Sequence, residues 1–222
     1  MLFIVATPIG NLEDITLRAL NVLNQVDFVV SEDTRETLKL LSHYNIKKPL
    51  ISYYRGCEKR RSYEIIKLLQ EGKKIALVCD RGTPGISDPA HYIVEMCHQH
   101  KLNVIPVPGA SALTAALSVS GFPVDCFSFY GFIPRKKKEK IEFFNSIREK
   151  KEMIVFFESV HRIMDTLEVL KDLFPERRIV VCRELTKKFE EIVAGSVSEI
   201  YDKFRQSPVK GEFVLILGGK QC

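Results

Sequence analysis

The first half of the chain alternates short apolar runs with amphipathic segments of helical period, and this alternation is its strongest constraint on folding. Each apolar run has the length of a buried strand, and a segment with apolar residues every three or four positions follows it after a short connection. Because parallel strands need crossover helices, the pattern predicts an α/β fold whose first sheet is mostly parallel, with helices on both faces. Strands are expected at residues 2–6, 28–30, 50–53, 74–79 and 103–107, and helices at 15–26, 34–44, 61–71, 90–100 and 111–120.

The pattern changes near residue 121. Two predicted strands, 178–184 and 189–194, are separated by a turn too short for a helix, which is typical of antiparallel pairing. We therefore predict two domains: an N-terminal α/β domain, 1–121, and a C-terminal mixed α/β domain, 122–222. The other expected elements of the second domain are strands at 126–132, 153–157 and 212–218, and helices at 136–150, 161–174 and 197–205.

Composition narrows the class of protein. The chain has 222 residues, 45% of them hydrophobic and 27% charged, which suits one large or two small globular domains. Its formal net charge of +5 permits an anionic partner without requiring one. No run approaches the ~18 apolar residues of a membrane-spanning helix, and the first residues lack the basic region of a signal peptide. The six cysteines include no C-x-x-C pair, so we expect a reduced, cytoplasmic protein without a metal site.

A loop dense in glycine and proline follows the predicted strand at 74–79. Residues 80–89, Asp-Arg-Gly-Thr-Pro-Gly-Ile-Ser-Asp-Pro, can neither continue the strand nor begin a helix, so backbone groups stay free for a ligand. In an open α/β sheet, ligands bind at such carboxyl ends of strands. Residues 7–14 form a second loop with only one glycine, so a phosphate-binding glycine loop is not expected. The alternatives are an ordinary tight turn and, for Asp14, capping of the next helix.

Charged residues directly follow several predicted strands. Glu32, Asp33 and Arg35 lie at the end of the second strand, where they are candidates to orient a polar substrate. Helix capping by Asp33 and a salt bridge at the rim of the sheet are the alternative roles. In the second half, Glu158 and Lys187 occupy comparable positions after apolar runs.

Residues 135–140, Arg-Lys-Lys-Lys-Glu-Lys, form a dense basic run beside Phe132 and Pro134. Most charge runs are solvated ends of helices. A local positive cluster near a domain junction also suits a phosphate backbone, and this is the functional alternative.

Five motifs, in this order, resemble the 16S ribosomal RNA (cytidine-2′-O)-methyltransferase family, whose members have the tetrapyrrole methylase fold. The resemblance extends over essentially the whole chain. The motifs are Ala-Thr-Pro-Ile-Gly-Asn-Leu-Glu-Asp-Ile-Thr-Leu-Arg-Ala-Leu at 6–20, Glu-Asp-Thr-Arg at 32–35, Gly-Thr-Pro-Gly-Ile-Ser-Asp-Pro at 82–89, Gly-Phe-Ile-Pro-Arg-Lys at 131–136 and Arg-Glu-Leu-Thr-Lys at 183–187.

The resemblance implies an enzyme that uses S-adenosylmethionine to methylate the ribose 2′-hydroxyl of a cytidine in the decoding centre of the small ribosomal subunit. It implies two α/β domains with the cofactor between them. It also implies a homodimer whose partner is 16S rRNA or the small subunit, with neither a membrane nor DNA involved. The absence of a phosphate-binding glycine loop agrees with S-adenosylmethionine as the cofactor, because this molecule carries no phosphate.

The resemblance also assigns residues. For cofactor binding they are Pro8, Gly82, Thr83, Pro84, Ile86, Ser111 and Ala112 in the first half, and Phe157, Leu185, Thr186, Glu212 and Phe213 in the second. We hypothesise that Glu32, Asp33 or Glu158 orients the hydroxyl and accepts its proton, while Arg35 and Lys187 hold phosphate. The residues expected to contact RNA are Arg81, Arg135, Lys136, Lys137 and Lys138.

Two other functions remain open at this stage. Some proteins with the implied fold methylate tetrapyrroles or other small molecules, although the basic run at 135–140 disfavours that substrate class. A non-catalytic RNA-binding or ribosome-assembly protein would bind RNA without binding S-adenosylmethionine. The chain departs from the family pattern at several positions. Arg81 stands where a small residue is usual, Ala90 where glycine is usual and Val160 where proline is usual. Residues 54–58, Tyr-Arg-Gly-Cys-Glu, replace a stretch that usually contains histidine and asparagine.

Overall fold

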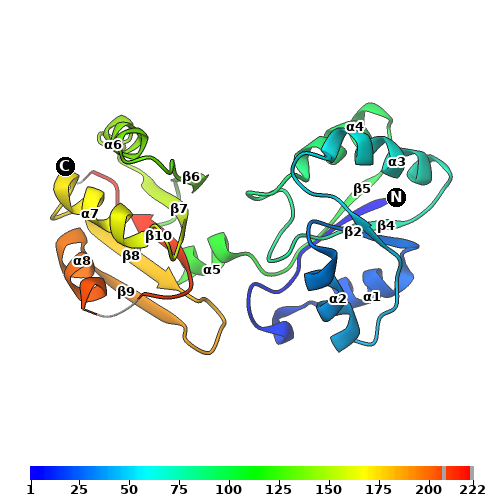
Figure 1. Cartoon of the computed structure of the whole chain (residues 1–222), viewed down its shortest axis with the longest axis horizontal. Coiled ribbons are helices and arrows are strands. Elements are labelled where there is room, and N and C mark those ends of the chain that lie inside the picture. The colour runs from blue at the N-terminus through cyan, green and yellow to red at the C-terminus, as the bar shows by residue number, and fades with distance from the viewer. Residues whose placement is uncertain (207–208, 221–222) are drawn as a thin grey trace. The chain divides into compact units, whose positions relative to one another are not determined.

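The computed structural model describes residues 1–206 and 209–220, which belong to two compact units, 1–111 and 112–222 (Figure 1). Helix α5 (Ala112–Ser118) is grouped with the second unit, where it packs against strand β10 (Glu212–Leu217). The domain boundary expected after residue 121 stays a prediction. None of the helices in the described residues is long and apolar enough to cross a membrane.

The first unit contains a five-stranded sheet in the order β3-β2-β4-β1-β5. All four neighbouring pairs are parallel, which confirms the prediction from the strand–helix alternation. In chain order the elements are β1 (Leu2–Val5), α1 (Leu17–Gln25), β2 (Phe28–Ser31), α2 (Thr34–His43), β3 (Leu50–Ser52), α3 (Glu58–Gln70), β4 (Ile75–Leu77), α4 (His91–Gln99) and β5 (Val104–Val107).

The helices of this unit cover both faces of the sheet (Figure 1). Apolar side chains of α1 and α2, such as Leu23 and Leu41, pack with Val29 on one face. On the other face, Ile65 of α3 and Ile93 of α4 pack in a separate core cluster. The chain therefore leaves β1 and β2 toward one face but leaves β4, which lies between them, toward the other. Such divergence between neighbouring strands is a topological switch point, where open α/β sheets bind ligands.

Helix α1 is capped by Thr16, whose side chain accepts a hydrogen bond from the backbone N–H of Ala19 at 3.1 Å. The expectation that Asp14 caps this helix is wrong. Asn11 instead caps a short 3₁₀ turn, Leu12–Asp14, which delays the start of α1 to Leu17. Ile15 ends the 3₁₀ turn in an extended conformation and Thr16 is the N-cap of α1, so neither residue is helical although the apolar periodicity had assigned both to the helix.

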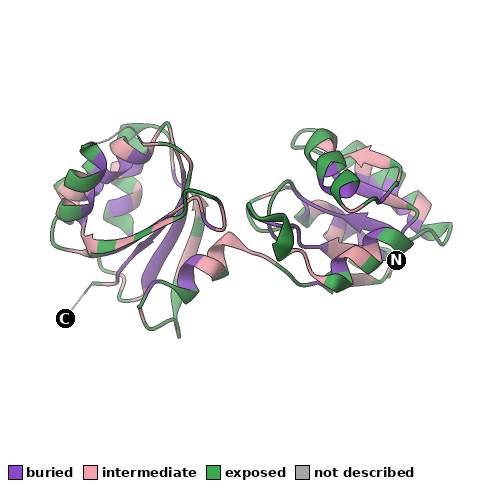
Figure 2. Cartoon of the chain, turned by 90° about the horizontal axis from the view of Figure 1, so that it is seen from below, coloured by how far each residue is buried: buried purple, intermediate pink, exposed green. Residues whose placement is uncertain are grey.

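The second unit contains a mixed five-stranded sheet in the order β6-β7-β10-β8-β9. Only β6 and β7 are parallel, and β8 pairs antiparallel with β9, as the short connection predicted. Helices α6, α7 and α8 share one core with the sheet, and Figure 2 shows central strands buried beneath partly exposed helices. The other elements are β6 (Phe127–Phe132), α6 (Lys137–Ser146), β7 (Met153–Ser159), α7 (Ile163–Leu173), β8 (Arg178–Arg183), β9 (Glu191–Ser196) and α8 (Val197–Arg205).

Candidate active site

The two loops singled out by the sequence lie side by side in the first unit. Thr7, after β1, and Gly82, after β4, exchange two backbone hydrogen bonds, N to O distances of 2.8 and 3.1 Å. A third loop joins them, because the hydroxyl of Thr83 donates to the carbonyl oxygen of Ala110 at 3.1 Å. The loops after three neighbouring strands, β4, β1 and β5, therefore converge at the carboxyl edge of the sheet.

Glycine at position 82 makes this convergence possible. Its φ of +85° is strained for any side chain, and an added Cβ would lie 3.3 Å from Cγ2 of Ile9. The rest of the loop is ordered by Asp88, whose carboxylate accepts hydrogen bonds from the backbone N–H groups of Gly85 and Ala90. Of the predicted cofactor residues here, Pro8 and Pro84 are buried and Ile86 is exposed.

Glu32 lies beside two other carboxylates, those of Asp80 and Asp88. Glu32 and Asp88 both line a small cavity of about 10 Å³ with Ser31, whose buried hydroxyl has no hydrogen-bond partner within the described chain. Asp80 is close by, because its carboxylate accepts a hydrogen bond from the backbone N–H of Asp33 at 3.0 Å. Burial raises the pKa of Glu32 above its ordinary value, and the negative charges of Asp80 and Asp88 raise it further. Glu32 is thus a half-buried carboxylate with an increased proton affinity.

Asp33 and Arg35 bind each other. Asp33 caps α2 by accepting a hydrogen bond from the backbone N–H of Arg35 at 2.8 Å, and its carboxylate also pairs with the Arg35 guanidinium at 2.7 Å. The hydrogen bonds from Arg35 lower the pKa of Asp33 to about 2. The capping and rim-salt-bridge alternatives are therefore both observed for this pair, and its catalytic role stays a prediction.

In the second unit, Glu158 is part of a buried network. Its carboxylate pairs with Arg162 at 2.6 Å and accepts a hydrogen bond from the hydroxyl of Thr166 at 2.8 Å. Lys140, also buried, donates to that same hydroxyl at 2.9 Å. These partners of Glu158 belong to α7 and to Arg162, which directly precedes that helix, so this carboxylate holds the core together and is poorly placed to meet a substrate.

Most of the remaining predicted residues of the second unit lie at the end of β8 and the start of β10, whereas Phe157 lies on β7. Lys187 pairs with Glu184 at 2.8 Å and with Glu212 at 2.7 Å, so its charge is already balanced. Next to it, Thr186 adopts a φ of +65°, and its buried hydroxyl has no hydrogen-bond partner among the described residues.

Leu185 and Phe213 are buried, and Phe157 lies half-buried in edge-to-face contact with Phe129 and Phe132.

The basic run is exposed at Arg135, Lys136, Lys137 and Lys138. Lys137 forms only a long contact of 3.4 Å with Glu168. Lys140, although part of the run in sequence, turns inward to the buried network. Lys136 pairs with Glu139 at 3.1 Å. Four of the five cations are thus exposed at the start of α6, and two of them already contact a carboxylate, so RNA contact by this run stays a prediction.

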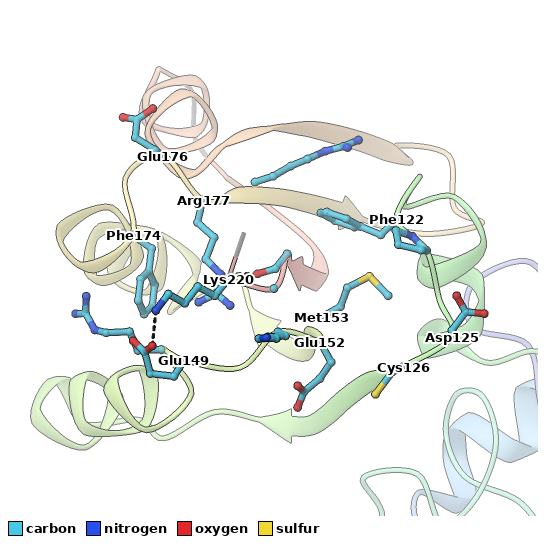
Figure 3. A pocket seen from close by; sticks show the side chains of 16 residues that line it. Phe122, Asp125, Cys126, Glu149, Glu152, Met153, Phe174, Glu176, Arg177 and Lys220 are labelled. Atoms are coloured by element: carbon cyan, nitrogen blue, oxygen red, sulfur yellow. Dashed lines mark hydrogen bonds and ion pairs between the residues drawn. The ribbon is translucent and has the colours of Figure 1, made fainter. Parts of the chain in front are cut away.

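A groove of about 850 Å³ lies elsewhere in the second unit, at the start of β7 and the end of β10 (Figure 3). Phe122, Met153 and Phe174 provide apolar surface, while Glu149 and Lys220 pair across it. None of the site residues predicted from the sequence lines this groove. In the described part of the chain, no cluster of histidine, cysteine and carboxylate groups is suited to a metal ion.

Sequence reasoning missed the role of Asp80 and Asp88 as neighbours of Glu32. The sequence places them 48 and 56 positions later, and only the adjacency of β2 and β4 brings them together. It also missed Arg55, whose charge opposes the pKa increase of Glu32. The signal available was that all these residues belong to segments that follow predicted strands.

The chain matches a known protein family and named relatives within it. Residues 1–201 match the tetrapyrrole (corrin/porphyrin) methylase family. Proteins named ribosomal RNA small subunit methyltransferase I are 46% identical in Thermotoga maritima, over 99% of both chains, and 43% identical in Bacillus subtilis, over 99% of this chain and 75% of the relative.

Solved structures agree on the fold. Diphthine synthase matches with a TM-score of 0.75 at 13% identity, over 98% of this chain and 89% of that one. Uroporphyrin-III C-methyltransferase from Thermus thermophilus, in complex with S-adenosylhomocysteine, matches with a TM-score of 0.63 at 17% identity, over 98% and 96%. From the converging loops, the mixed second sheet and these matches, we conclude that the chain belongs to the tetrapyrrole methylase family and, within it, to the ribosomal RNA small subunit methyltransferase I proteins.

Proposed function

We propose that this protein uses S-adenosylmethionine to methylate the ribose 2′-hydroxyl of a cytidine in the decoding centre of small-subunit ribosomal RNA. The names of its relatives support ribosomal RNA as the substrate. The observation that carries the proposal is the convergence of three loops at the carboxyl edge of the parallel sheet, tied by the Thr7–Gly82 bridge and the Thr83–Ala110 hydrogen bond. The cytidine, its 2′-oxygen and a homodimeric assembly come from the family resemblance.

The predicted donor-binding residues fit S-adenosylmethionine. In the first unit Gly82 lies close to Ile9 and to the backbone of Ala110 and Ser111, so the three loops meet through backbone groups and without the glycine-rich loop that binds phosphate. In the second unit the buried, unpartnered hydroxyl of Thr186 offers a hydrogen bond to a polar group such as those of the adenosine or amino acid portion. When bound, this cofactor supplies an electrophilic methyl group for in-line attack by an oxygen.

Glu32 is the strongest candidate for the residue that handles the proton. A ribose hydroxyl is a poor acid, so a carboxylate with a raised pKa is a better match for it than an ordinary one. Among the three proposed carboxylates, Glu158 is occupied inside the core and Asp33 is held by Arg35. Glu32 is partly exposed and forms no ion pair with any residue that the structure describes. Asp80 and Asp88 then act as positioning residues that sustain its basicity.

The proposal is tested with labelled S-adenosylmethionine and small subunits isolated from cells that lack this protein. We expect one ribose-methylated cytidine, mapped by its resistance to alkaline cleavage.

Glu32→Gln is expected to lower kcat by about 100-fold while the donor Kd is unchanged. Because the pKa of Glu32 is raised, wild-type activity should fall as pH decreases through that raised value, where the base becomes protonated. Methylation of a precorrin but not of subunits, or no donor binding at all, would overturn the proposal.

A further inference from the structure

An exposed basic and aromatic surface borders Glu32 in the first unit. We call it the β3–α3 patch and define it by Tyr54, Arg55, Lys59, Arg60 and Tyr63. The tyrosines are 52% and 65% exposed, and all three cations are exposed. Aromatic side chains usually bury most of their area, so two exposed rings beside three exposed cations are an unusual combination on a protein surface.

The patch is physically continuous with the candidate active site. The backbone N–H of Tyr53, which precedes it, donates to the carbonyl oxygen of Ser31 at 2.8 Å, and β2 and β3 run parallel with Ser31 opposite Ser52. The ends of both strands therefore lie together at the edge that carries Glu32. Arg55 is near enough for its charge to lower the proton affinity of Glu32.

The backbone that presents the patch is firmly held. The thiol of Cys57 donates to the carbonyl oxygen of Tyr54 at 3.1 Å, and the Cys57 backbone N–H donates to the same oxygen at 3.0 Å. Gly56 closes the turn with a φ of +102°, and its N–H donates to Glu58. The buried hydroxyls of Tyr53 and Ser62 lie 3.0 Å apart and fasten the turn to α3. A preorganised surface binds with less loss of conformational freedom than a mobile one.

The chemistry of the patch fits single-stranded RNA. Arg55, Lys59 and Arg60 form no ion pair with any described residue, so they remain available for an anion, unlike Lys187 and Arg35. Lys59 and Tyr63 are four positions apart on α3 and therefore share one face of the helix. Cations that follow a phosphate backbone, with exposed rings for unpaired bases to stack on, are the features of single-strand binding.

We propose that the β3–α3 patch binds the single-stranded RNA that flanks the methylated nucleotide, with Tyr54 stacking on a base and Arg55, Lys59 and Arg60 holding phosphates. This inference rests on the proposed function and adds an RNA contact surface in the first unit, separate from residues 135–138 of the second.

The test compares two triple variants with equal loss of charge. Arg55→Ala/Lys59→Ala/Arg60→Ala removes the cations of the patch. Lys47→Ala/Lys67→Ala/Lys73→Ala removes three exposed cations near the opposite, amino edge of the same sheet. Affinity for a single-stranded RNA of the decoding-centre sequence is measured by fluorescence anisotropy across a salt series. The patch variant is expected to bind at least tenfold more weakly, and the slope of log K against log salt should decrease by about 2. The control variant should keep wild-type affinity and slope.

Tyr54 is tested by two substitutions. Tyr54→Ala is expected to weaken RNA binding about tenfold, whereas Tyr54→Phe, which keeps the ring, should bind as the wild type does. S-adenosylmethionine affinity, measured by calorimetry, should not change in any variant.

A measurement on the unsubstituted protein removes any dependence on variant folding. Bound RNA should protect Lys59 from acetylation but leave Lys73 reactive. The patch is ruled out if wild-type protein methylates RNA while the patch variant and Tyr54→Ala bind RNA normally, or if Lys59 stays reactive. A wild-type protein that neither binds the donor nor methylates RNA would instead refute the proposed function.

Discussion

Single residues decide how closely the loops of the candidate active site approach one another. Gly82 and Gly72 have the same φ of +85°, but their surroundings differ. An added Cβ at Gly82 would lie against Ile9, whereas Gly72 has no atom within 4 Å of that position. Alanine substitutions at Gly72 and Gly82 therefore separate the free-energy cost of a strained backbone from the cost of crowding the loops.

We expect Gly72→Ala to destabilise the protein by about 1–2 kcal/mol, the cost of a left-handed conformation for a residue with a Cβ. Gly82→Ala should cost about 1–3 kcal/mol more, because Ile9 must move. It should also weaken S-adenosylmethionine binding, which Gly72→Ala should not affect. Urea unfolding and calorimetry measure both quantities. Equal stability and equal donor affinity in the two variants would contradict a role for close loop packing.

At the scale of elements, a buried ionic network joins α6 and α7 to β7. Lys140 is 2% exposed, and burial lowers its pKa. Glu158 binds Arg162 and Thr166 from inside the same core. The periodicity of the sequence predicted the three elements, but it placed Lys140 in an exposed basic run, because composition cannot distinguish one inward lysine from its exposed neighbours.

The two ends of this network should respond differently to substitution. Glu158→Ala removes the partner of a partly buried arginine and is expected to cost about 3–5 kcal/mol of stability. Lys140→Met replaces a costly buried charge with an apolar chain of similar length, so stability should be unchanged within about 1 kcal/mol or increase. Thermal and urea unfolding compare the variants. A large loss in Lys140→Met would show that the ammonium group itself stabilises the core.

At the scale of the whole molecule, donor binding should stabilise the folded chain, because a ligand that binds the native state and not the unfolded state shifts the folding equilibrium. S-adenosylmethionine at 100 times its Kd adds about 2.7 kcal/mol to the free energy of unfolding. For a chain of this size, that corresponds to an increase in Tm of about 5–10 °C. ATP, which shares the adenosine but carries phosphates, is the matched control and should produce no shift. A shift with ATP equal to that with S-adenosylmethionine would argue against the site as assigned.

The sequence by itself determined the order and type of nearly all elements, the parallel first sheet and the mixed second sheet. These depend on hydrophobic period and connection length, which are local properties of the chain. The start of α1 was missed, because capping by Thr16 is decided by a single hydrogen bond that periodicity does not report.

Only the tertiary structure decided which charges are neighbours. Strand order brings Asp80 and Asp88 to Glu32 and the β3–α3 patch to the same edge, and packing turns Glu158 and Lys140 inward. A pKa, an ion pair or an open surface depends on distance and burial, and both are set by contacts between residues far apart in the chain. The kinds of groups at the site and the Asp33–Arg35 pair were therefore predictable from sequence, whereas the partners of Glu32, Glu158 and Lys140 were not.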